Sequence, residues 1–217
     1  MSRRILNIAL SFVVIISSFG MLMSQEAGST FEGVVKYRFM MQNPAGMTDE
    51  QRNEMMTQME SMMGKHFVYS FKENKMKTEL DGQLMKLTYY YFGGDSIYMM
   101  DDLSPEVQIA PVDDGWNFEY STVERVPNAK EVQGIMCDLI VFKSDKYSWK
   151  YYYNTQYKLS PTFFEKYKSG FWNKAIEETG SLPLEFEGKI SGSYLFMTAD
   201  EIIEGPVDDA IFELPGN

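Results

Sequence analysis

The stretch FVYSFKENKMKTEL, from Phe67 to Leu80, decides the fold class of this chain. It holds two short strand-like segments, Phe67–Lys72 and Lys75–Leu80, separated by the turn signal Glu73-Asn74. Strands that follow each other across so short a connection pair in an antiparallel manner. Because similar segments occur on both sides of this stretch, the sequence predicts a sheet built from consecutive hairpins.

Further strands are expected along most of the chain, separated by clusters of Asp, Asn and Gly. In the first strand, Phe31–Gln42, apolar and polar residues alternate, as they do in a strand with one buried face. The other predicted strands are Leu84–Phe92, Ser96–Met100, Val107–Ala110, Phe118–Val126, Lys130–Val132, Cys137–Lys143, Trp149–Tyr153, Leu184–Lys189, Gly192–Met197 and Ala199–Ile203.

Two helices are expected to interrupt the strands. The first begins at Thr48, in a capping box with Gln51 as its third helical residue, and ends before Gly64. The second follows Ser160-Pro161, which suits an N-cap with proline in the first helical position. Its apolar stripe consists of Phe163, Tyr167 and Phe171, and Gly170 weakens this second prediction.

Two helices are too few to cover both faces of a large sheet. The sequence therefore predicts a mainly β fold of the α+β class. Its core is a curved antiparallel sheet or unclosed half-barrel, with the helices packed on the concave side. The sequence contains neither an internal repeat nor a linker, so residues 25–217 are interpreted as a single domain.

The first 24 residues are interpreted as a secretory signal peptide. Arg3 and Arg4 precede the apolar segment Ile5–Ile16, and small residues follow. This apolar segment is too short to span a bilayer core of about 30 Å. Cleavage is expected near Ser24, with Gly20 as the alternative site, and an uncleaved anchor is the competing interpretation. The protein is thus predicted to be periplasmic or secreted, with no transmembrane segment after signal removal.

The chain is acidic, with 31 Asp and Glu residues against 20 Lys and Arg residues and a formal net charge of −11. Loss of Arg3 and Arg4 with the signal peptide would make the net charge about −13. A chain this acidic repels phosphate backbones and anionic lipid head groups. Nucleic acid is therefore not expected as a partner.

Four short stretches carry a resemblance to a known group of proteins. They are Phe31–Tyr37, Lys130–Cys137, Gly180–Glu185 and Asp208–Pro215. In their order and spacing they resemble a family of secreted bacterial proteins of unknown function. That family is similar in pattern to the periplasmic lipoprotein carriers of the LolA and LppX type. The resemblance implies an unclosed β half-barrel whose mouth is plugged by helices, and an apolar cavity for acyl chains; it implies no catalytic residues.

The residue types that support catalysis or metal binding are scarce. His66 is the single histidine and Cys137 the single cysteine. A catalytic triad would therefore depend on His66, and a zinc site made of several His or Cys ligands is not expected. We interpret His66 as a solvated residue at a helix end and Cys137 as a buried thiol in a strand. The paired aspartates Asp101-Asp102, Asp113-Asp114 and Asp208-Asp209 are interpreted as solvated turn residues. The protein is thus predicted to be non-enzymatic and to need no cofactor or metal.

Methionine is the most distinctive feature, because eight of the 17 methionines lie between Met40 and Met63. Three interpretations stay open: plain core packing, a flexible apolar lid or docking surface, and a Cu(I) site near His66. The leading hypothesis is a binding protein for a hydrophobic ligand such as a lipid or acyl chain. The alternative is an envelope interaction or structural module that docks a protein partner through the methionine-rich helix. The predicted ligand-binding residues are Met55, Met59, Met62, Met63, Phe163, Tyr167 and Phe171.

Overall fold

The computed structural model describes residues 30–42, 47–104, 106–113, 119–145, 147–190 and 193–215. The predicted signal peptide lies outside these residues. Eleven strands form one antiparallel sheet in the order β6-β5-β4-β3-β2-β1-β11-β10-β9-β8-β7. Its strands are β1 (Gly33–Gln42), β2 (His66–Lys72), β3 (Lys75–Asp81), β4 (Lys86–Tyr91), β5 (Ser96–Asp101), β6 (Gln108–Pro111), β7 (Thr122–Val132), β8 (Ile135–Lys143), β9 (Ser148–Lys158), β10 (Ser181–Ile190) and β11 (Ser193–Glu204).

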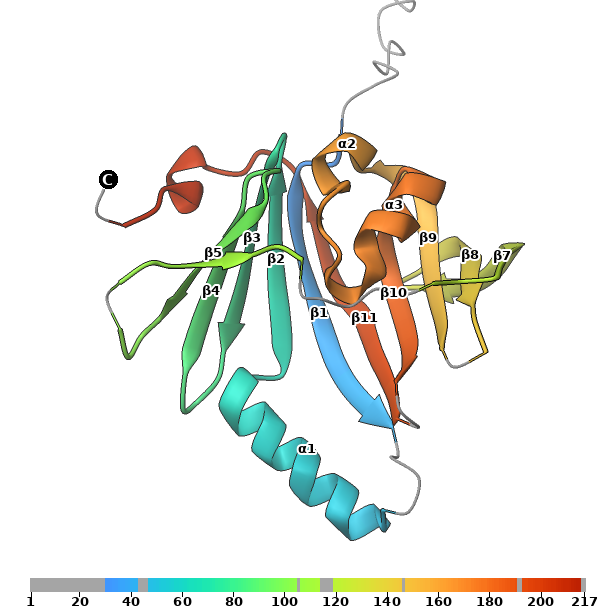
Figure 1. Ribbon diagram of the computed structural model, residues 1–217, viewed down its shortest axis with the longest axis horizontal. Coiled ribbons are helices and arrows are strands. Elements are labelled where there is room, and N and C mark those ends of the chain that lie inside the picture. Colours follow the sequence, from blue (N-terminus) through green and yellow to red (C-terminus); the bar gives the residue numbers. More distant parts are fainter. Residues whose placement is uncertain are drawn as a thin grey trace, which may run out of the picture.

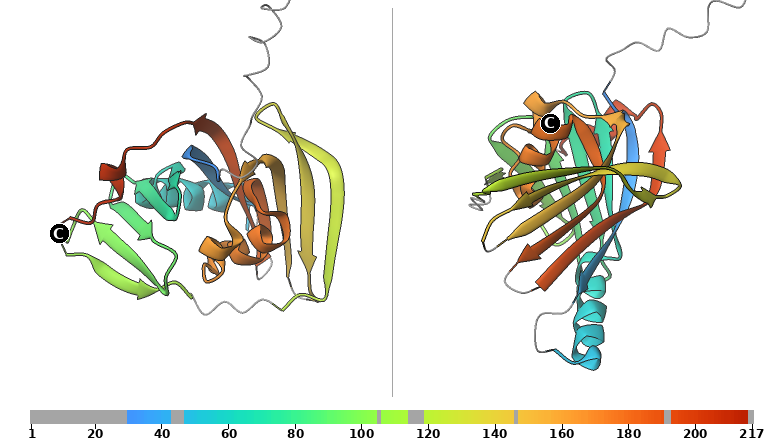
Figure 2. Two further views of the ribbon diagram at one scale, coloured as in Figure 1. Left: turned by 90° about the horizontal axis from the view of Figure 1, so that it is seen from above. Right: turned by 90° about the vertical axis from the view of Figure 1, so that its right-hand side faces the viewer.

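The sheet is curved but not closed, which confirms the predicted fold class (Figure 1). Eleven strands spaced about 4.8 Å apart would place the edge strands of a flat sheet about 48 Å from each other. The chain, however, passes from the end of β6 at Pro111 to the start of β7 at Thr122. These eleven residue steps reach at most about 40 Å. The connection thus requires the sheet to bend, and the view from above shows its two arms facing each other (Figure 2).

Two predicted pairs of separate strands are single bulged strands in the structure. Strand β7 continues through Pro127 and Asn128, where the pairing with β8 shifts register and Asn128 adopts a φ of +48°. Strand β11 likewise runs without interruption past Asp200, opposite a register shift in β1. A bulge keeps both flanks in the sheet while it re-aims the chain, so the local break signals did not end the strands.

The second predicted helix is broken into three parts. Helix α2 (Pro161–Phe164), the 3₁₀ turn η1 (Ser169–Phe171) and helix α3 (Trp172–Thr179) follow one another on the concave side of the sheet (Figures 1 and 2). We call residues 160–183 the plug segment. Gly170 and Phe171 both adopt left-handed backbone angles, with φ of +58° and +61°. A right-handed helix cannot continue through two such residues, so the prediction of one continuous stripe was wrong.

Helix α1 (Asp49–Met63) confirms the predicted capping box, because Thr48 Oγ1 accepts from Gln51 N and Gln51 Oε1 accepts from Thr48 N. Its position differs from the prediction, since α1 projects from one end of the sheet instead of lying on the concave face (Figure 1). None of its residues is buried. Its C-terminal end is held at the β3–β4 turn, where Leu84 N donates to Ser61 O.

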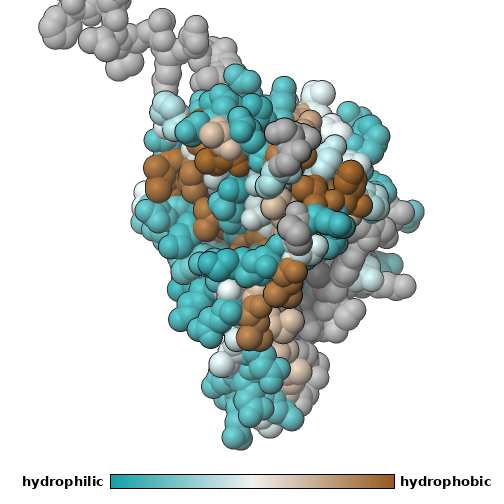
Figure 3. All heavy atoms as spheres, turned by 90° about the vertical axis from the view of Figure 1, so that its left-hand side faces the viewer, coloured by the Kyte–Doolittle hydropathy of each residue, from teal (hydrophilic) through white to brown (hydrophobic). Residues whose placement is uncertain are grey.

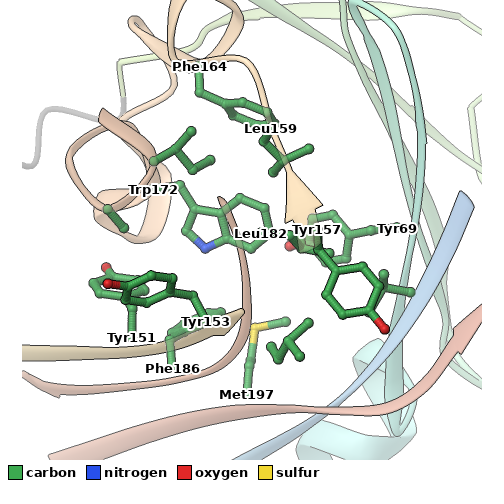
Figure 4. Packing of buried hydrophobic residues seen from close by; sticks show 14 of the residues in the cluster. Tyr69, Tyr151, Tyr153, Tyr157, Leu159, Phe164, Trp172, Leu182, Phe186 and Met197 are labelled. Atoms are coloured by element: carbon green, nitrogen blue, oxygen red, sulfur yellow. The ribbon is translucent and has the colours of Figure 1, made fainter. Parts of the chain in front are cut away.

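The core lies between the concave face and the plug segment, and Trp172 is at its centre (Figure 4). This indole is 2% exposed and stacks on Tyr69 of β2 at a centroid distance of 5.3 Å. It also meets Tyr37 of β1 and Phe186 of β10 edge to face. One side chain of the plug segment therefore joins three strands, and burial of such an aromatic side chain typically contributes about 3–5 kcal/mol.

The C-terminal segment is fastened to the β2–β3 hairpin by one carboxylate. Asp209, in the 3₁₀ turn η2 (Asp209–Phe212), accepts from Lys72 Nζ at 2.8 Å and from Lys75 Nζ at 2.7 Å. These two lysines, Lys72 first, lower the pKa of Asp209 to about 2. Lys72 Nζ also donates to Val207 O, so the same lysine holds the chain that leads into the turn.

The free energy of unfolding is expected to depend on the protonation of Asp209. Its folded-state pKa lies below the value of about 3.9 typical of an unfolded chain. Its contribution is therefore present above about pH 4 and is lost as the pH falls toward about 2. The free energy of unfolding, measured by urea denaturation between about pH 4 and pH 2, should fall less steeply in Asp209→Asn than in the wild type. Lys75→Met should also make the free energy of unfolding fall less steeply with decreasing pH. If both variants show the pH dependence of the wild type, the assignment to Asp209 is contradicted.

Candidate functional site

Three tyrosines of the concave face hold the plug segment through its backbone carbonyls. Tyr37 of β1 donates to Pro183 O at 2.6 Å, Tyr91 of β4 donates to Phe163 O at 3.0 Å, and Tyr151 of β9 donates to Gly170 O. The broken helix leaves carbonyls such as those of Phe163 and Gly170 without continuous helical pairing. Because a buried carbonyl needs a partner, these phenols fix the plug segment to both arms of the sheet.

Burial raises the pKa of each of these phenols. The pKa values of Tyr37 and Tyr151 lie well above the usual value for tyrosine, since the low-dielectric core disfavours the phenolate. The pKa of Tyr91 is raised to about 12 by burial first and by Asp95 and Glu165 next. All three therefore remain neutral donors, and none is poised as a general base at neutral pH.

A cavity of about 300 Å³ lies between the plug segment, the concave face of β2–β5 and the C-terminal end of α1. Most of the strand residues that line it are every second residue of their strand, because alternate side chains of a strand point to the same face; Tyr90 is the exception. The lining residues are Met63, Phe67, Tyr69, Met76, Thr78, Leu80, Leu87, Tyr89, Tyr90, Tyr91, Ile97, Tyr167 and Ser169.

The polar groups in this wall are hydroxyls. Thr78 is 4% exposed, and its Oγ1 has no hydrogen-bond partner of normal geometry in the part of the chain that is described. Its neighbour across the strand pair is Tyr69. Burial raises the pKa of Tyr69 well above the usual value, and the nearby Thr78 hydroxyl acts in the opposite direction. The wall is thus aromatic and aliphatic, and seven of its thirteen described residues carry a hydroxyl group that can orient a ligand.

The structure brings together only two of the predicted site residues. Met63 and Tyr167 both line the cavity, one from the end of α1 and one from the plug segment. Met55 and Met59 lie further along α1, half-buried and apart from the cavity wall. Met62 is 51% exposed. A single methionine face does not form the pocket, because Met63 is the only residue of α1 among the described residues that line it.

The other two predicted site residues are core residues. Phe163 packs on Tyr91 with a centroid distance of 5.0 Å and is 6% exposed. Phe171 turns toward the opposite arm and packs on Phe142 of β8 at 5.1 Å. The break at Gly170 sends these two side chains to different arms of the sheet. Phe163 packs on Tyr91, as Tyr167 does, but neither Phe163 nor Phe171 is among the described residues that line the cavity.

Most of the cavity wall was missed by sequence reasoning. The inward-facing residues of β2, β3 and β4, such as Tyr69, Thr78 and Tyr89, form one cross-strand row in the sheet. The alternation in these segments was the available signal. It identifies which residues share a face, but it does not show that the plug segment leaves part of that face uncovered.

His66 lies on the opposite, convex face of the sheet. Its Nε2 is 3.3 Å from Asp200 Oδ2, and Asp200 also pairs with Arg38 Nη2 at 3.2 Å. The cross-strand partner of His66 is Arg38, which follows the buried Tyr37 in β1. Because neighbouring strand residues point to opposite faces, Arg38 and His66 share the convex face, and the imidazole points away from the cavity that Met63 lines. This arrangement separates His66 from Met63 and removes the geometry needed for a shared copper site.

Cys137 is a buried thiol, as predicted. It is fully buried, and burial raises its pKa to about 11, so a thiolate is disfavoured at neutral pH. No group of three His, Cys, Asp or Glu side chains suited to a metal occurs in the described ranges. The paired aspartates serve turns and ion pairs; Asp101 Oδ1, for example, accepts from Leu103 N and Ser104 N. Asp114 lies outside the described residues.

The fold and the pocket define an unclosed antiparallel sheet that encloses an apolar cavity against a helical plug. No protein-family model matches the chain, and no curated protein matches its sequence. A solved structure described as "Structure of PNGF-II in P21 space group" is similar at 11% sequence identity and a TM-score of 0.42. The match covers 85% of this chain and 30% of that one, and a likeness this distant supports no functional inference. Among the helices that the structure describes, none has the length and apolar character needed to cross a membrane.

The break in the plug segment is expected to be sensitive to substitution at Gly170. Alanine would be strained at a φ of +58°, and its Cβ would lie 3.3 Å from the Trp172 ring. We expect Gly170→Ala to lower the free energy of unfolding by about 1–2 kcal/mol in urea denaturation. Gly94→Ala is the matched control, because no atom lies within 4 Å of its added Cβ. Equal effects of the two substitutions would contradict the proposed constraint.

Proposed function

We propose that the protein is a non-enzymatic binding protein for a hydrophobic ligand, such as a lipid or an acyl chain. The observation that carries this proposal is the cavity of about 300 Å³ between the concave face and the plug segment. Its aromatic and aliphatic walls suit an apolar ligand. Each Å² of apolar surface that such a ligand removes from water contributes about 25 cal/mol to the free energy of binding.

The size of the cavity favours a slender ligand. Small-molecule pockets usually measure about 300–1,000 Å³, so this one is at the lower limit. One alkyl chain or one small ring system fits such a volume better than a lipid with several acyl chains. A larger ligand would require the plug segment to move, and this segment is held by three phenol–carbonyl hydrogen bonds and the Trp172 packing.

The proposed place of action is the periplasm or the extracellular medium. The support for it is the interpretation of residues 1–24 as a secretory signal peptide, with Arg3 and Arg4 before an apolar segment. A carrier for water-insoluble molecules is useful in an aqueous compartment next to a membrane, where a free apolar ligand would be poorly soluble.

Two adjacent methionines provide a matched test of this proposal. The neutral fluorescent probe N-phenyl-1-naphthylamine should bind the purified mature protein with increased emission. Met63→Gln places an amide in the cavity wall and should weaken probe binding about tenfold, since a buried polar group without a partner costs about 1–3 kcal/mol. Met62→Gln, at a 51% exposed position of the same helix turn, should leave the affinity within about twofold.

Native mass spectrometry of protein purified from its own envelope would identify a natural ligand. We expect an apolar molecule to co-purify with the wild type and with Met62→Gln and to be reduced in Met63→Gln. Protein that carries no extractable ligand and does not bind the probe would contradict the proposal. Circular dichroism of both variants would show that a loss of binding does not arise from unfolding.

A second function is favoured by the exposed apolar residues beside β4–β6. Apolar side chains gather on this side of the molecule, above the hydrophilic α1 (Figure 3). Leu84, Leu103 and Ile109 are 66%, 76% and 67% exposed, and Met62 lies next to Leu84 at the end of α1. Because α1 carries four carboxylates and one arginine, the matching partner would be a protein with an apolar groove and a basic rim.

A photo-crosslinking residue at position 62 tests this interaction. The alternative predicts one envelope protein crosslinked from position 62 and not from position 94, with a yield that falls as salt screens the acidic helix. Crosslinks of equal yield from both positions, or a yield that is independent of salt, would contradict specific docking at this surface.

A further inference from the structure

We infer that the cavity selects a ligand whose buried part is uncharged and carries a hydrogen-bond acceptor, such as a long-chain alcohol, ester or ketone. This inference rests on the proposed function, because it specifies the chemistry of a ligand in the same cavity. It excludes a free fatty-acid anion as the preferred ligand, although the alkyl chains of the two kinds of molecule are identical.

The cavity wall supplies no compensating charge for an ionic ligand. All thirteen described lining residues are uncharged, and their polar atoms are hydroxyls of Tyr, Thr and Ser. A carboxylate taken from water into such a site would lose its hydration without gaining a cation. A neutral ligand oxygen loses much less hydration free energy, because one hydrogen bond donated by the protein replaces most of its hydrogen bonding to water.

The donor that matches such an oxygen is the Thr78 hydroxyl. Thr78 is 4% exposed and lies in the cavity wall on β3. Its hydroxyl lies near the Tyr69 phenol but makes no hydrogen bond of normal geometry within the described residues. A hydroxyl can donate one hydrogen bond and accept others, and leaving it buried without a partner has a cost. A ligand carbonyl or hydroxyl oxygen beside Thr78 Oγ1 would remove that cost, whereas a pure hydrocarbon would not.

The charged groups around the cavity also disfavour an anion. Two lysines of the plug segment are paired across to the β4–β6 arm: Lys166 Nζ is 2.7 Å from Asp95 Oδ1, and Lys168 Nζ is 2.5 Å from Asp113 Oδ2. The pKa of Tyr91 is raised by burial first and then by Asp95 and Glu165, so two carboxylates lie near this wall. On the α1 side, Lys65 faces Glu60 and Lys86 faces Asp81. An incoming carboxylate would compete with these aspartates and glutamates for the lysines.

A ten-carbon series separates the head-group chemistries. The affinities of 1-decanol, decanoate and decylammonium for the mature protein would be measured at pH 7 by displacement of N-phenyl-1-naphthylamine. We expect decanol to bind at least about ten times more tightly than decanoate. The carboxylate of decanoate would lose its hydration without gaining a cation, and the alcohol would not. We expect decylammonium to bind more weakly than decanol for the same reason.

Two threonine variants locate the donor. Thr78→Val keeps the shape of the side chain and removes the hydroxyl, so decanol binding should weaken about three- to tenfold. Thr88→Val on β4 is the matched control, because Thr88 alternates with the cavity residues Leu87 and Tyr89 and faces the convex side. We expect Thr88→Val to leave decanol affinity within about twofold.

The outcomes distinguish this inference from the function on which it rests. If neither the fluorescent probe nor any member of the series binds, the proposed function fails together with the inference. If decanol binds but decanoate or decylammonium binds as tightly or more tightly, the binding function stands and the neutral-ligand inference is overturned. Equal loss of decanol affinity in Thr78→Val and Thr88→Val would likewise overturn the assignment of Thr78 as the donor.

Discussion

The structure depends on how buried carbonyls of the plug segment are satisfied. Two consecutive left-handed residues, Gly170 and Phe171, interrupt the helix, so backbone oxygens near the break lack helical partners. Tyrosines from β1, β4 and β9 donate to this segment, which ties both arms of the sheet to one short stretch of chain. Trp172 then fills the space between them. The curved sheet and its plug are therefore one packing unit.

The cavity follows from the shape of this unit. The short, broken plug segment packs on β1, β8, β9 and β10 and leaves a cavity against β2–β5. The end of α1 supplies Met63 to the remaining wall, and the rest of α1 extends away from the sheet. This hollow is lined by aromatic, aliphatic and hydroxyl groups, with no charged lining residue among those described, and it is the basis of the proposed binding of a neutral, slender molecule.

Sequence patterns predicted the elements better than the site. Alternation and turn signals placed most strands, and the capping box at Thr48 placed the start of α1 within a residue. The methionine-rich helix attracted the site prediction because its composition is unusual. Local spacing shows that Met59 and Met63 share a helix face, but it does not show which turn of the helix reaches the sheet. Phe163 and Phe171 were grouped on one stripe for the same reason, and the break at Gly170 separates them.

The sequence by itself determined the antiparallel hairpins, the capped first helix, the acidic character and the scarcity of catalytic residue types, because each of these depends on residues close together in the chain. Only the tertiary structure decided that β1 pairs with β11, that β6 and β7 stay unpaired edges, and that Thr78 and Tyr167 share a cavity. These features depend on contacts between residues far apart in sequence. Such contacts are set by the curvature of the whole sheet and the volume of the side chains that fill it, and no local pattern encodes either quantity.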